Sequence, residues 1–123
     1  MLKVHAKKLG NVVMLCLQGR MVRGETAALR SAVDSQSGVS AVFLDLGRVS
    51  TIDAGGLGVM LELRELIQAK GIEFRLINVT KLVRRILEIT SLDSVFEITS
   101  GAAVVSAAMP GRQKSVAQFA ACA

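Results

Sequence analysis

Short apolar segments alternate with amphipathic helical patterns along this chain, and this alternation limits its fold more than any other feature. The clearest segment runs from Val39 to Leu46, is rich in β-branched and aliphatic residues, and lies between two helical patterns. Such a segment is typical of a central strand whose two faces are covered. Asp45, near the carboxyl end of the segment, is its one charged residue. A chain of 123 residues has room for a single domain built around such a strand.

The N-terminal part of the chain has the pattern of a β-hairpin. Residues 2–8 alternate loosely between polar and apolar side chains, Gly10-Asn11 is a turn signal, and an apolar run follows from Val12 to Leu17. Gly19 is expected to close the second strand of this hairpin.

Further helices and strands follow from the spacing of the apolar residues. The expected helices cover 25–36, 57–69 with Gly71 as the stop signal, a segment capped by Thr80, and an Ala-rich segment over 101–109. The expected later strands cover 72–77 and 96–98. This order predicts an α/β layered fold, in which helices pack against a small mixed β-sheet. We expect the domain to cover residues 1–108 and a flexible C-terminal tail to cover 109–123.

The distribution of charge argues against a nucleic-acid-binding protein. The 15 basic and 10 acidic residues give a net charge of +5, but the excess lies at the two ends of the chain. Residues 1–23 carry five basic and no acidic residues, whereas residues 24–97 carry eight basic and ten acidic residues. The sequence therefore indicates no single basic face of the kind that binds nucleic acid.

Membrane, metal and catalytic signals are weak. The longest uncharged stretch has 14 residues, which is short of the ~20 that span a bilayer, and no secretory signal begins the chain, so we expect a cytoplasmic protein. The single histidine, His5, has no second histidine or cysteine beside it to form a metal site. No Gly-x-Ser-x-Gly motif is present. We expect no catalytic residues, no metal and no cofactor.

The segment Ser50 to Gly58 leads from the central strand into the second helix and carries the main functional signal. Asp53 is placed to cap that helix, and Gly55 and Gly56 are expected to leave its N-terminus open to an anion or a partner. Asp45 and Asp53 are candidates for a carboxylate pair, although capping and solvation explain both without chemistry.

These residues resemble the STAS family, the domain of anti-sigma factor antagonists. The family carries a strand ending in Asp-Leu, then Ile-Asp-Ser-Ser/Ala-Gly-Leu-Gly, then an amphipathic helix; Asp45-Leu46 and Ile52 to Gly58 match this series. The resemblance continues through residues 71–79 and 83–96 and covers about residues 1–108. It implies a STAS-like fold.

The resemblance also implies a function and a site. A STAS antagonist binds a serine-kinase-type anti-sigma factor and so regulates transcription by partner switching. The kinase phosphorylates the Ser or Thr directly after the motif Asp, a position held here by Ala54, which has no hydroxyl. Ser50 and Thr51, just upstream, are the alternative acceptors. The implied partner-binding residues are Asp53, Ala54, Gly55, Gly56, Leu57 and Gly58.

Two other functions fit parts of the same segment. One is the STAS subunit of a phospholipid-trafficking ABC transporter, which binds an ATPase. Its loop can have the sequence Asp-x-Gly-Gly, which Asp53 to Gly56 match. A nucleotide-binding protein would use the glycines from Gly55 to Gly58 as a phosphate cradle, but the Gly-Lys-Ser/Thr of a P-loop is missing.

Overall fold

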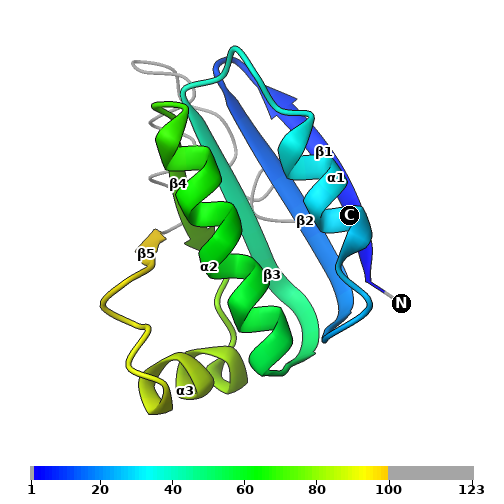
Figure 1. Cartoon of the computed structure of the whole chain (residues 1–123), viewed down its shortest axis with the longest axis vertical. Helices are drawn as coiled ribbons and strands as arrows, with labels where there is room; N and C mark the ends of the chain where they lie inside the picture. The colour runs from blue at the N-terminus through cyan, green and yellow to red at the C-terminus, as the bar shows by residue number, and fades with distance from the viewer. Residues whose placement is uncertain (1, 100–123) are drawn as a thin grey trace.

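Five strands form one sheet in the order β1-β2-β3-β4-β5, and three helices accompany it (Figure 1). The structure is a computed structural model that describes residues 2–99. Its elements are β1 Lys3–Leu9, β2 Val12–Met21, α1 Ala27–Asp34, β3 Ala41–Ile52, α2 Ala54–Ala69, β4 Glu73–Ile77, α3 Lys81–Ile89 and β5 Glu97–Thr99. The helix expected over 101–109 and the tail expected over 109–123 lie outside the described residues.

The sheet is mixed, as the sequence predicts. β1 and β2 pair antiparallel through a turn at Gly10, whose φ of 59° suits glycine. β2, β3, β4 and β5 are parallel to one another, and Val42 of the central strand has Val13 and Phe74 as its neighbours in register. The hairpin and the later parallel strands are thereby confirmed.

The apolar run of β2 serves both faces of the sheet, because successive side chains of a strand point to opposite sides. Val13, Leu15 and Leu17 belong to the main core, which also holds buried residues of all three helices. The alternate residues of β2 belong to a second buried cluster on the other face. This second cluster consists of Val12, Met14, Cys16, Ala41, Phe43 and Ile77.

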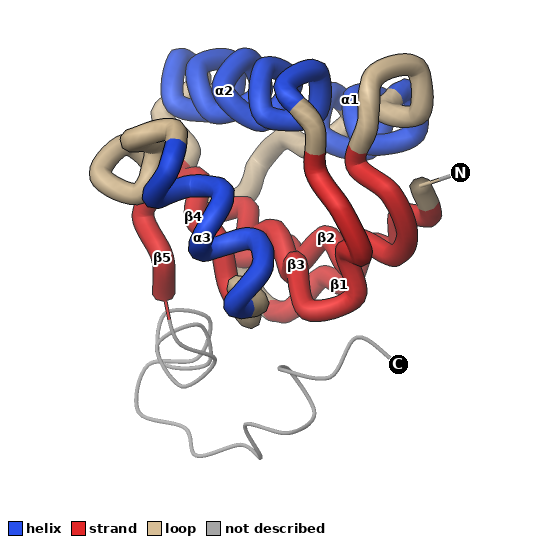
Figure 2. Tube along the Cα trace, turned by 90° about the horizontal axis from the view of Figure 1, so that it is seen from below, coloured by secondary structure: helices blue, strands red, loops and turns tan. Residues whose placement is uncertain are grey.

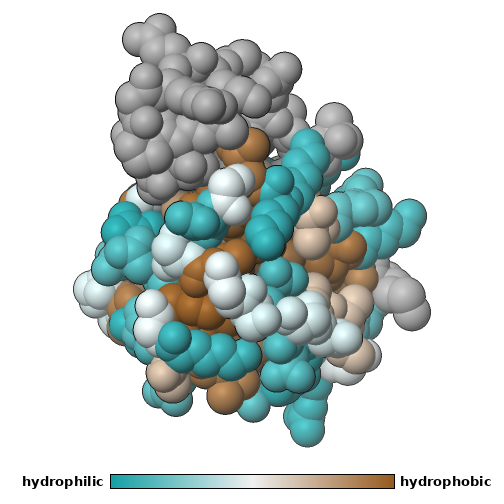
Figure 3. Space-filling model, turned by 90° about the horizontal axis from the view of Figure 1, so that it is seen from above, coloured by the Kyte–Doolittle hydropathy of each residue, from teal (hydrophilic) through white to brown (hydrophobic). Residues whose placement is uncertain are grey.

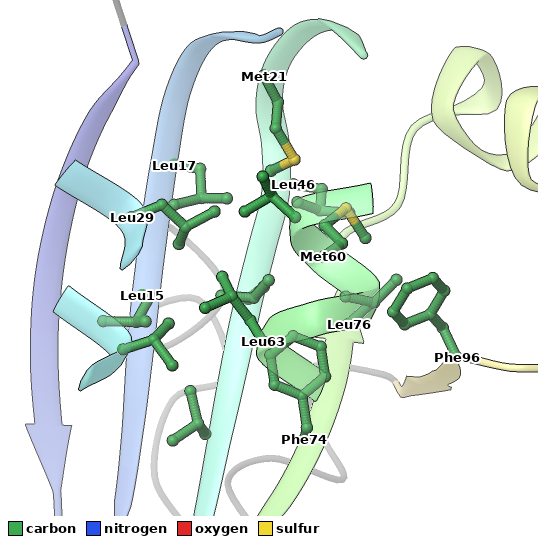
Figure 4. Packing of buried hydrophobic residues seen from close by; sticks show 14 of the residues in the cluster. Leu15, Leu17, Met21, Leu29, Leu46, Met60, Leu63, Phe74, Leu76 and Phe96 are labelled. Atoms are coloured by element: carbon green, nitrogen blue, oxygen red, sulfur yellow. The ribbon is translucent and has the colours of Figure 1, made fainter. Parts of the chain in front are cut away.

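Helices α1 and α2 lie beside each other on one face of the sheet (Figure 2), and an ion pair of 2.6 Å joins Arg30 of α1 to Glu62 of α2. The core between them and the sheet is aliphatic, with leucine and methionine side chains meeting from both layers (Figure 4). Phe74 and Phe96 add one ring contact with centroids 6.4 Å apart. No helix within residues 2–99 is long and apolar enough to cross a bilayer.

Helix α3 lies at the end of the molecule where β3 and β4 finish, which is also the end at which α2 begins (Figures 1 and 2). The opposite end shows hydrophilic residues with hydrophobic ones between them (Figure 3). The direction of the chain explains why α3 and the start of α2 lie at the same end of the molecule. β3 leads into α2 and β4 leads into α3, and the two strands are parallel neighbours, so both helices begin at the same edge of the sheet.

Three predicted boundaries are wrong, all around this edge. β2 continues past Gly19 to Met21, and β3 continues past Leu46 to Ile52. Register shifts on both sides of Gly19, where φ is 115°, allow the two strands to stay paired although their polar residues interrupt the apolar pattern. Helix α2 begins at Ala54, three residues before the predicted start at Leu57, because Asp53 caps it directly after the strand.

Candidate functional site

Asp53 begins the site by capping helix α2, as the sequence predicts. Its backbone is extended, and its Oδ1 accepts a hydrogen bond of 2.8 Å from the N–H of Gly56. Its carbonyl oxygen accepts the first helical bond, from the N–H of Leu57, at 2.9 Å. This cap places Ala54 in the first turn of α2, where it is exposed.

A second contact of Asp53 reaches across the chain to the loop that follows β2. The N–H of Arg23 donates to both carboxylate oxygens of Asp53, at 3.1 and 3.2 Å. The N–H of Asp53 in turn donates to the carbonyl oxygen of Met21 at 3.3 Å. The Asp53 carboxylate therefore links the start of α2 to the β2–α1 loop by hydrogen bonds to both. The sequence pattern gives no signal for this link, and sequence reasoning missed Met21 and Arg23.

Gly55 and Gly56 have a different role from the one expected. A Cβ on Gly55 would lie 2.7 Å from the Cβ of Arg23, and a Cβ on Gly56 would lie 2.0 Å from the carbonyl oxygen of Met21. The two glycines thus let the chain's own β2–α1 segment approach the helix, so they do not leave the helix N-terminus open. The N–H of Gly56 already donates to Asp53, so it is not free to bind the phosphate of a nucleotide.

The six predicted partner-binding residues differ in how far they are exposed to solvent. Asp53, Ala54 and Gly58 are exposed, Gly55 is half-buried, and Gly56 and Leu57 are buried. Nothing lies within 4 Å of a Cβ built on Gly58, in contrast to Gly56. The part of the predicted site that faces solvent is therefore formed by Asp53, Ala54 and Gly58, which we call the α2 start surface.

The charge of this surface is set by hydrogen bonds to the cap. The N–H of Gly56, and after it the N–H of Arg23, holds the pKa of Asp53 below its ordinary value of 3.8, because both donors favour the ionised carboxylate. Asp53 is therefore an anion at neutral pH, next to the exposed Ala54.

The alternative acceptors lie within β3 and not on the helix. Ser50 is exposed, and its hydroxyl donates to the carbonyl oxygen of Gly19 at 3.1 Å. Thr51 is half-buried and stands beside Arg20 in the sheet register. Both residues precede the cap, so neither occupies the position of Ala54.

The contacts described for Asp45 and Asp53 are to different groups, so they give no support to a carboxylate pair. Asp45 is 4% exposed; its Oδ1 accepts from the N–H of Gly47 at 2.8 Å and its Oδ2 accepts from the Asn78 amide at 2.9 Å. Among residues 2–99, no cluster of three His, Cys, Asp or Glu side chains is placed to hold a metal ion.

Comparison with known proteins identifies the family to which this chain belongs. The family model described as the STAS domain matches residues 3–105, and the chain belongs to that family. A relative assigned as an anti-sigma factor antagonist, BtrV of Bordetella bronchiseptica, is 30% identical over 110 residues, which cover 87% of this chain and 94% of BtrV.

Solved structures show the same fold. A protein of Thermotoga maritima assigned as an anti-sigma factor antagonist, TM1081, superposes with a TM-score of 0.71 at 25% identity, covering 85% of this chain and 93% of that protein. The unphosphorylated anti-sigma factor antagonist SpoIIAA superposes with a TM-score of 0.70 at 16% identity, covering 85% of this chain and 95% of SpoIIAA. The STAS-like fold predicted from the sequence is confirmed.

Proposed function

We propose that this chain is an anti-sigma factor antagonist that binds a serine-kinase-type anti-sigma factor through the α2 start surface. It acts in the cytoplasm by binding and not by catalysis, and its binding releases a sigma factor from the anti-sigma factor. The relationship to BtrV and to TM1081, both assigned as anti-sigma factor antagonists, supports the proposal.

The observation that carries the proposal is the exposed first turn of α2, with Ala54 directly after a well-formed cap. Asp53 is fixed by donors from Gly56 and Arg23, so Ala54 is presented from a rigid position. A rigid, exposed segment can bind a partner without a large ordering cost.

Ala54 also determines how binding is regulated. A phosphoryl group at this position would add a charge of about −1.5 to −2 beside the ionised Asp53, and the like charges would repel each other and disturb the contact. Alanine offers no hydroxyl for that modification, so the chain stays in its binding-competent state when the kinase is active. We therefore infer a constitutive antagonist.

The test combines binding with a phosphorylation assay. The chain is incubated with ATP and a candidate serine-kinase anti-sigma factor from the same organism, and its intact mass is measured. We expect no mass gain for the natural chain and one phosphate for Ala54→Ser, which restores the acceptor. A phosphate on the natural chain would overturn the constitutive state, and mapping it to Ser50 or Thr51 would identify an alternative acceptor.

Binding to the same anti-sigma factor is measured by calorimetry. Ala54→Glu introduces a charge at the α2 start surface and should weaken binding by tenfold or more, on the order of 1.4 kcal/mol. Equal affinity of Ala54→Glu and the natural chain would show that the α2 start surface is not the contact.

A further inference from the structure

Helix α3 exposes two large apolar side chains. Leu82 is 51% exposed and Ile89 is 70% exposed, and the third large hydrophobic residue exposed among the described residues, Leu66 at 49%, belongs to α2. Exposed apolar side chains that stand alone are common on protein surfaces, so their arrangement decides whether they form a contact surface.

The two residues share one side of α3. Positions i, i+3 and i+7 of a helix lie on one stripe, and Leu82, Arg85 and Ile89 have this spacing. Val83 and Leu87 anchor the helix because both are fully buried in the main core. The Thr80 hydroxyl caps the helix by accepting from the N–H of Val83 at 3.3 Å. The outward stripe is thus held by a fixed helix.

The charge around this stripe is predominantly positive. Lys81, Arg84 and Arg85 are exposed, and Glu88 is the one exposed acidic residue of α3. Within residues 2–99, none of the three basic side chains forms an ion pair, whereas Arg30 and Arg75 do. We call Lys81, Leu82, Arg84, Arg85 and Ile89 together the α3 surface.

The α3 surface lies at the same end of the molecule as the α2 start surface, because both helices begin at the edge of the sheet where β3 and β4 finish (Figures 1 and 2). A partner that covers the first turn of α2 therefore approaches the end of the molecule that carries α3. An interface of standard size covers about 800 Å² on each partner, which is more than one helical turn provides.

We propose that the α3 surface is a second contact region for the anti-sigma factor, and that it selects a partner with acidic residues around an apolar patch. This inference rests on the proposed function. The basic residues supply attraction and partner discrimination, and Leu82 and Ile89 supply apolar contact at the centre. A lipid surface is a poorer match, because two aliphatic side chains on a nine-residue helix offer a bilayer little apolar area.

The experiment measures, by calorimetry at low and high salt, the affinity for the same candidate serine-kinase anti-sigma factor. Arg84→Glu with Arg85→Glu reverses the charge of the α3 surface, and Leu82→Ser with Ile89→Ser removes its apolar part. Lys3→Glu with Lys8→Glu makes the same change in net charge at exposed positions of β1, and Leu66→Ser removes an exposed leucine elsewhere. Circular dichroism checks that every variant is folded.

We expect each α3 double variant to weaken binding roughly tenfold or more, and the two controls to change it by less than about twofold. The charge-reversed variant should also lose most of the salt dependence of binding, since screening acts on the attraction it removes. If both α3 double variants bind as tightly as the natural chain while Ala54→Glu loses binding, this inference is overturned and the proposed function stands.

Two further outcomes overturn the inference in other ways. No binding by the natural chain would overturn the proposed function together with the α3 contact. The second outcome is tested by measuring binding of the chain to vesicles of phosphatidylcholine with phosphatidylserine. Vesicle binding that the α3 variants lose, with protein binding unchanged, would assign the surface to a membrane.

Discussion

The backbone N–H of Arg23 donates to both carboxylate oxygens of Asp53, at 3.1 and 3.2 Å, across a sequence separation of thirty residues. The same carboxylate caps α2 through Gly56. One side chain therefore holds the helix start and the β2–α1 loop in a fixed relation, and the position of Ala54 depends on both contacts.

This double role of Asp53 predicts a pH dependence. Its pKa is lowered on folding, so its contribution to stability is fully present above its unfolded pKa, near 3.8, and is lost as the pH falls through the lower folded value. We expect the difference in melting temperature between the natural chain and Asp53→Asn to be largest at neutral pH and to shrink in acid. Melting curves from pH 7 to pH 3 check this, and a difference that does not change with pH would contradict it.

The glycines of α2 provide a matched pair of substitutions. Gly56→Ala would place a Cβ 2.0 Å from the carbonyl oxygen of Met21, so the backbone must move, at an expected cost of about 1–3 kcal/mol or more. Gly58→Ala meets no atom within 4 Å and should stabilise the helix by up to about 1 kcal/mol. Urea unfolding of both variants measures the two effects, and our account requires them to have opposite signs.

The hydroxyl of Thr80, which caps α3, should make a measurable contribution of its own to the free energy of unfolding. Thr80→Ala removes the acceptor for the N–H of Val83 and should lower the free energy of unfolding by about 1 kcal/mol. Thr80→Ser keeps a hydroxyl at the same place and should recover most of this loss. Chemical denaturation compares the three chains, and equal loss in both variants would mean that the hydroxyl is not the cause.

Asp45 should be more costly to remove than a surface carboxylate. Its side chain is buried and accepts from the Gly47 N–H and the Asn78 amide, so Asp45→Ala removes two part-buried hydrogen bonds to a carboxylate, at about 1–3 kcal/mol. Asp93→Ala, at an exposed position, is the control and should stay within about 0.5 kcal/mol. The prediction fails if urea unfolding shows the same loss for both.

Local patterns predicted much of this fold. The apolar runs located the strands, the helical spacing located the helices, and Asp53, Thr80 and Gly71 act as the caps and the helix stop that their residue types indicate. The ends of β2 and β3 were missed because exposed polar residues such as Arg48 and Ser50 break the apolar pattern, while sheet pairing continues.

The candidate site was predicted less completely, because its geometry depends on contacts between distant segments. Nothing near Asp53 in the sequence shows that Arg23 will donate to it, or that Gly56 will lie against Met21. Such contacts are fixed by the sheet register of β2 against β3, which a single sequence does not display.

The manner in which Arg23 is held has an evolutionary consequence. Asp53 binds the peptide N–H of this residue and not its guanidinium, and the side chain is exposed next to the first turn of α2. Any residue type except proline supplies the same N–H. Position 23 can therefore change its side chain while the helix start keeps its anchor. Chains with different residues at position 23 would keep the same start of α2, and the exposed side chain would give each of them a different contact beside the α2 start surface.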